Sequence, residues 1–320
     1  MRRDRLACRS TMARVLAVML NTYREAVRAR LLHGLFAVAI ATAFYSAIVG
    51  EFASRSKMRV VSDLGAASIS LYGIIVAVVI ASTSLYRELE LKTIFPILAR
   101  PIRRGEYLVG KYLGAVFTMA VFITANVGVL LLALAFMADR SLFLVLGTVL
   151  GSVALAFLIA WRIPRTRTYA PAAWALVIGV AGWFLAAPAP DDRGVVVFSA
   201  VLTVLEVGVV SAMATVLAAF SSPFLTAVCT FGLFIVGRSA DTMAHLPVKV
   251  FGAAIQQTGV ALSKVFPNLM LYVPPRPLLV GDVPEVTLSR YLLDCSFHAV
   301  AWSVGLMAVA TLIFKRRDFI

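Results

Sequence analysis

The feature of this sequence that most restricts its fold is a series of eight long apolar runs that together contain one charged residue. The runs cover residues 31–50, 64–86, 112–137, 141–161, 170–187, 195–219, 221–237 and 295–314. A helix needs about 20 apolar residues to cross a hydrocarbon core about 30 Å thick. Within a bilayer, only helices and closed barrels satisfy their own backbone hydrogen bonds. The pattern therefore predicts an all-α polytopic membrane protein with about eight spans.

Composition and charge distribution agree with this class. Hydrophobic residues make up 61% of the 320 residues and charged residues 14%, which is outside the range of soluble globular domains. The net charge of +14 could suggest a nucleic-acid partner, but 20 of the 30 Lys and Arg residues lie in four segments, 1–30, 87–111, 162–169 and 315–317. Short cytoplasmic segments of membrane proteins carry such an excess. We therefore expect both termini to be cytoplasmic and no nucleic acid to be bound.

The most informative of these segments is the charged stretch of residues 87–111, between the second and third runs. By composition alone, its charges could be solvated or snorkelling side chains beside a bilayer. Their order is more specific. The residues that carry the pattern are Arg87, Glu88, Glu90, Lys92, Thr93, Arg100, Pro101, Arg103, Arg104, Glu106 and Lys111.

The order RELELKTI, LARPIRRGEYL and GKYLG over residues 87–114 resembles the signature loop of permease subunits of type 2 ATP-binding-cassette (ABC) exporters. The resemblance is to the branch that includes nitrous oxide reductase maturation and gliding-motility permeases. A second block, residues 21–32, is similar to the segment before the first span in that branch. Lys92 departs from the pattern, because many members have Gly before the Thr.

This resemblance implies a six-span permease core, so the hairpin of residues 141–187 is interpreted as an insertion. It also implies an inner-membrane complex with a cytoplasmic ABC ATPase and with a second permease copy or a related permease. Segment 87–111 would be the ATPase-coupling element. The substrate and the direction of transport stay open, and lipid, peptide, glycan or mechanical work on a periplasmic partner are all compatible with the spans.

No nucleotide site is expected in this chain. Residues 105–112 nearly match the phosphate-binding pattern G-x-x-x-x-G-K-[ST], but Tyr112 stands where a Ser or Thr hydroxyl would hold Mg²⁺. No strand is expected before this stretch, and it runs directly into a span. ATP and Mg²⁺ are therefore expected on a separate subunit, and this chain is not expected to be an enzyme. The three Cys and three His residues are isolated in sequence, so no metal site is predicted.

Glu206 is the one charged residue well inside an apolar run. A charge at the middle of a membrane is costly, so Glu206 is expected to face protein or water. It could line a transport path together with Asn126, or it could make a structural contact with a polar residue of a neighbouring span. An ion-coupled secondary transporter and a membrane-embedded enzyme are the alternative functions, but both need more intramembrane ionisable groups than are found here.

The chain is expected to form one transmembrane domain, residues 31–320, after a basic tail and a cytoplasmic amphipathic helix within residues 1–30. In helical register, Val15, Met19 and Tyr23 share an apolar face of that helix, which would lie on the membrane surface. Residues 238–290 are expected to be external. Their Pro residues and Gly interruptions predict short helices on or in the outer leaflet.

Overall fold

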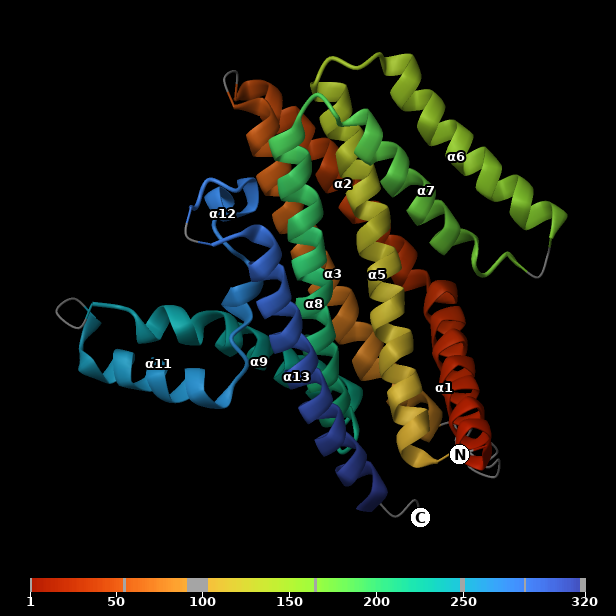
Figure 1. The fold of residues 1–320 in the computed structure, drawn as a ribbon, viewed down its shortest axis with the longest axis vertical. Helices are drawn as coiled ribbons and strands as arrows, with labels where there is room; N and C mark the ends of the chain where they lie inside the picture. Colours follow the sequence, from red (N-terminus) through yellow and green to blue (C-terminus); the bar gives the residue numbers. More distant parts are fainter. Residues whose placement is uncertain are drawn as a thin grey trace.

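The structure is a computed structural model of the chain, and it describes residues 2–53, 56–90, 103–163, 166–247, 251–284 and 286–316. Within these ranges the protein is helical and has no strand (Figure 1). Its elements are α1 (Arg2–Arg28), α2 (Arg30–Phe52), α3 (Lys57–Glu90), α5 (Arg104–Met137), α6 (Leu142–Arg162), α7 (Ala170–Leu185), α8 (Pro190–Ala218), α9 (Pro223–Ala244), α11 (Ala253–Val265), the 3₁₀ helix η2 (Leu269–Tyr272), α12 (Arg276–Val280) and α13 (Leu288–Arg316).

Seven of the described helices, α2, α3, α5, α6, α8, α9 and α13, are long and apolar enough to cross a membrane. This is the architecture of a multi-pass membrane protein. Each of the eight predicted runs coincides with a helix, but the fifth run forms α7, which has only 16 residues. The helix ends at Leu185 because the approach to Pro188 disfavours the helical conformation.

Helices α5 and α8 form the centre of the bundle, and α6 lies at its edge (Figure 1). Two thirds of the most apolar window of α5 and of α8 is buried within the chain, compared with 11% for α6. Helices α3 and α13 pack against α8, and their apolar side chains form one core with those of α5. The exposed apolar side chains of α6, such as Phe157, therefore form a surface suited to lipid.

Helix α1 begins at Arg2, so most of the residues expected to form a basic tail belong to a helix. Arg, Leu and Ala, which recur in this stretch, are strong helix formers. The helix packs along the first half of α5, where Gly110 and Gly114 let the two backbones approach closely (Figure 1). Its predicted apolar face contacts protein, since Tyr23 is fully buried.

The region expected to be an external loop, residues 238–290, begins inside a helix. Helix α9 continues to Ala244, two turns beyond the predicted end of the seventh run at Gly237. A single Arg and a single Asp in these turns do not interrupt a helix, because charge alone does not break backbone hydrogen bonding. The described residues that follow form α11, η2 and α12, which are all short.

Candidate functional site

Glu206 forms an ion pair with Arg238, a residue of α9. The carboxylate is completely buried on α8, and its two oxygens accept hydrogen bonds of 2.8 Å each from Nε and Nη2 of Arg238. Nη2 also donates to Ser70 Oγ of α3 at 3.0 Å. Two parallel bonds from a guanidinium to a carboxylate are among the strong hydrogen bonds of proteins. The pair therefore joins three helices and compensates the buried charge.

Arg238 was not among the sequence-predicted site residues, because the predicted span ended one residue before it. The extension of α9 to Ala244 places it beside α8 instead. One signal could have identified it. A buried carboxylate within a span is usually paired with a basic residue. Arg238 directly follows the end of the seventh apolar run, which is the next run after the one that contains Glu206.

A cavity of about 610 Å³ lies between α3, α8, α9 and the segment that contains η2 and α12. Arg238 lines it with a side chain that is 25% exposed, and Glu206 lies behind this arginine. Hydroxyl groups of three helices also line the cavity, from Ser70, Thr203 and Ser239. The volume falls in the range of small-molecule sites, about 300–1,000 Å³. The cavity is therefore large enough for a small molecule, and it offers that molecule hydroxyl groups and a guanidinium.

One edge of this cavity carries a second ion cluster, centred on Arg276 of α12. Its guanidinium donates to Asp63 of α3, to Asp192 of α8 at 2.5 Å and to Ser62 Oγ at 2.9 Å. Partial burial lowers the pKa of Arg276, but the hydrogen bonds and charges of the two aspartates more than offset this and raise its pKa above the ordinary value. The cluster fastens α12 to the ends of two core helices.

Asn126 does not take part in the candidate site. Its side chain is buried on α5 and donates to the backbone carbonyl of Phe122, one turn earlier, at 2.8 Å. It does not line the cavity that contains Arg238. No hydrogen bond joins the described side chains of Asn126 and Glu206, and the charged partner of Glu206 comes from α9.

The predicted ATPase-coupling residues divide into three groups. Arg87, Glu88 and Glu90 belong to the last turn of α3. Lys92, Thr93, Arg100 and Pro101 lie outside the described residues. Arg103, Arg104, Glu106 and Lys111 lie at the start of α5.

The start of α5 is bound to α1 and α13. Glu106 is 10% exposed and forms an ion pair with Arg14 of α1 at 3.3 Å, and Thr11 Oγ1 donates to the same carboxylate at 3.3 Å. Glu106 also accepts a bond from the backbone N–H of Arg103 at 3.4 Å, which stabilises the first turn of the helix. Arg104 donates to the carbonyl of Lys315, near the end of α13, at 3.3 Å.

Lys111 connects α5 to α3. Its ammonium group donates to the carbonyl oxygen of Ser84 at 2.8 Å and to the hydroxyl of Ser84 at 2.9 Å, and the residue is 6% exposed. A lysine in this position holds two helices together and does not present its charge to solvent. Among residues 103–111, for which exposure is described, Arg103 is the exposed one.

Comparison of the chain with protein-family models and with curated proteins finds no match. The functional assignment therefore rests on the geometry above and on the residue order of segment 87–114. Within the described residues, no group of three His, Cys, Asp or Glu side chains is arranged to hold a metal ion.

Proposed function

We propose that this chain is the transmembrane permease subunit of a type 2 ABC exporter in the inner (cytoplasmic) membrane. It would move or extrude a substrate by using ATP hydrolysis on a separate cytoplasmic ATPase, together with a second permease copy or a related permease. The observation that carries the proposal is where the two helices that flank the charged stretch meet it. Helix α3 ends and α5 begins at the end of the molecule where α1 begins and α13 ends (Figure 1).

The contacts at the start of α5 support a coupling role for this segment. Within the segment, Glu106, Arg104 and Lys111 of α5 bind α1, α13 and α3 respectively. A displacement of the segment by a closing ATPase dimer would therefore be passed to four helices together. Packed side chains and hydrogen-bond networks of this kind carry energetic coupling between distant sites.

Helix α3 also supports a connection between the segment and the cavity. It carries Ser84, which binds Lys111, then Ser70, which binds Arg238, and near its other end Asp63, which binds Arg276. Over 34 residues it is about 51 Å long. A tilt or shift of α3 would change the contacts at both ion clusters of the cavity. On this proposal, Arg238 lines the transport path and Glu206 lies behind it.

The test is the charge reversal Glu88→Lys with Glu90→Lys. If the segment binds the ATPase, the reversal places like charges or unpaired groups at an interface, which costs several kcal/mol. We expect loss of co-purification with the cognate ATPase and loss of substrate-stimulated ATP turnover in reconstituted membranes. The matched control reverses Glu51 and Asp282, which lie on α2 and beyond α12, and it should leave both measurements unchanged.

Two outcomes would contradict the proposal. Normal association and normal ATP turnover in the Glu88 and Glu90 double variant would show that these two residues do not contribute to ATPase binding. Transport that proceeds without any ATPase and follows an imposed ion gradient would instead favour a secondary transporter.

A further inference from the structure

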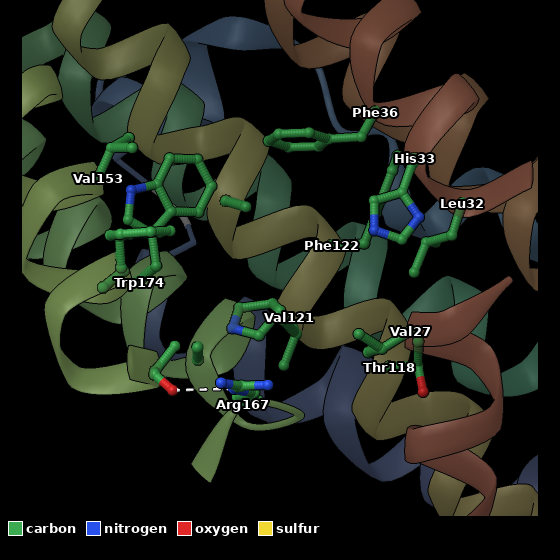
Figure 2. A pocket seen from close by; sticks show the side chains of 16 residues that line it. Val27, Leu32, His33, Phe36, Thr118, Val121, Phe122, Val153, Arg167 and Trp174 are labelled. Atoms are coloured by element: carbon green, nitrogen blue, oxygen red, sulfur yellow. Dashed lines mark hydrogen bonds between the residues drawn. The ribbon is translucent and has the colours of Figure 1, made fainter. Parts of the chain in front are cut away.

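A second pocket, of about 430 Å³, lies between the α6–α7 hairpin and the rest of the bundle. Its walls come from the end of α1, from α2 and α5, and from both helices of the hairpin (Figure 2). Its lining is mainly aliphatic and aromatic. Its larger apolar side chains include Phe36, Phe122, Val153, Phe157 and Trp174.

The aromatic wall of this pocket is held in place by specific contacts. Phe36 packs edge-on against Trp174 and against Phe122, with ring centroids 5.9 Å and 6.0 Å apart. The indole Nε1 of Trp174 donates to Ser152 Oγ of α6 at 3.2 Å, so its hydrogen-bonding group is satisfied away from the pocket. The wall therefore offers a preformed apolar surface, which suits a hydrocarbon chain.

One end of the pocket is basic. Figure 2 shows Arg167 at the end opposite Phe36, where its Nε donates to the carbonyl of Ala160 at 3.1 Å. Within the described residues, no hydrogen bond engages its two Nη atoms. Nearby, Arg24 donates to the hydroxyl of Tyr169 at 2.6 Å.

The sequence around this end is also basic. Arg28 and Arg30 flank the junction of α1 and α2, next to the lining residue Val27. Over residues 21–33 and 160–171 the single acidic residue is Glu25. Its carboxylate accepts a hydrogen bond from Asn21 at 2.8 Å. The electrostatic environment of this end therefore favours an anion.

We propose that this pocket binds an anionic phospholipid, with one acyl chain between the hairpin and the core and the phosphate at Arg167. Besides Arg167, the polar side chains that line the pocket are His33 and Thr118, whose Nδ1 and Oγ1 atoms bond to the backbone carbonyls one turn earlier on their helices. The rest of the lining is apolar, which suits an acyl chain better than a water-soluble substrate. The exposed apolar surface of α6 lies beside the pocket, so a lipid can enter from the bilayer. Basic pockets between transmembrane helices bind lipid head groups in this manner. The α6–α7 hairpin then has a role as a lipid clamp, independent of any ATPase.

The experiment is lipid binding to the purified full-length chain, measured by native mass spectrometry. The probes are phosphatidylglycerol and phosphatidylcholine with identical acyl chains, so they differ in net charge and not in chain chemistry. We expect the wild-type protein to retain phosphatidylglycerol preferentially. A single basic residue near an anionic head group contributes a factor of about five to association.

Two variants test the contributions of the basic charge and of the apolar cavity separately. Arg167→Gln should lower phosphatidylglycerol binding about fivefold, to the level of phosphatidylcholine, and its control is Arg140→Gln at the other end of the hairpin. Ala156→Phe fills the pocket and should lower the binding of both lipids. Its control is Ala154→Phe, an exposed position two residues away on α6 that does not line the pocket.

The proposal is overturned if the wild-type protein binds the two lipids equally, or if either variant binds phosphatidylglycerol as its control does. A phosphatidylglycerol with a photoactivatable acyl chain gives an independent measurement. Adducts at the lining residues of α5 and α7 support the site. Adducts spread evenly over the outer surface of α6 would mean annular lipid only.

Discussion

At the scale of single residues, Glu206 and Arg238 depend on one another. An isolated carboxylate within a span is costly, and so is an isolated guanidinium. Their bidentate contact at 2.8 Å offsets both costs. Removing one partner of a buried pair is more harmful than replacing both, because the remaining charge stays buried without compensation. The pair consequently has a structural role in addition to any role in transport.

This pairing gives a prediction for Glu206→Gln. We expect the substitution to destabilise the protein by about 3 kcal/mol, at the low end for a broken buried pair, because Arg238 is partly exposed to the cavity. Thermal unfolding of the purified protein measures this loss. The double variant Glu206→Gln with Arg238→Gln should recover about 1–3 kcal/mol relative to the sum of the single changes. Strict additivity would contradict the pairing.

Arg276 gives a second prediction at this scale. Arg276→Lys keeps the charge but cannot hold Asp63 and Asp192 in one planar fork. We expect α12 to detach more often, so that a cysteine placed at Ser239 on the cavity wall reacts about tenfold faster with a soluble thiol reagent. That factor corresponds to the loss of about 1.4 kcal/mol. The control is Arg290→Lys at the start of α13, for which the labelling rate should not change.

At the scale of elements, the contact between α1 and α5 depends on small residues. A Cβ atom on Gly110 would lie 2.7 Å from Val18 Cβ, and one on Gly114 would lie 2.6 Å from Thr22 Cβ. Small residues four apart let two helices approach closely in this way. The same approach lets Glu106 reach Arg14.

We therefore predict that Gly114→Ala destabilises the protein by about 1–3 kcal/mol, because the added methyl group meets the backbone of Met19 as well as Thr22. The matched control is Gly151→Ala on α6, where no atom lies within 4 Å of the added group. That change should be neutral or stabilising, since Ala is the better helix former. Denaturant or thermal unfolding compares the two. Equal effects would contradict the close α1–α5 contact.

The helices could largely be located from the sequence, because long charge-free runs have few alternatives in a bilayer. Their ends and partners could not. A helix such as α9 continues through Arg238 as long as its backbone bonds are satisfied, and hydropathy alone cannot show this. The amphipathic pattern of α1 also does not show whether its apolar face contacts lipid or protein. That choice depends on Gly110 and Gly114, which are distant in sequence.

At the scale of the whole molecule, the position of the charged segments gives a topology prediction. In a cysteine-free background, Thr166→Cys should be shielded from an impermeant thiol reagent in intact cells, and Arg140→Cys should react. The reason is that segment 162–169 is basic and contacts α1, whereas Arg140 lies at the other end of the hairpin. Labelling efficiency in intact and permeabilised cells measures this. Labelling of Thr166→Cys in intact cells would contradict the predicted cytoplasmic position of the α6–α7 turn.

The short length of α7 has a consequence for the surrounding bilayer. Its 16 residues measure about 24 Å, whereas the hydrocarbon core is about 30 Å thick and the neighbouring α6, with 21 residues, measures about 32 Å. We therefore expect the membrane to be thinner beside α7, and the protein to favour membranes with shorter acyl chains.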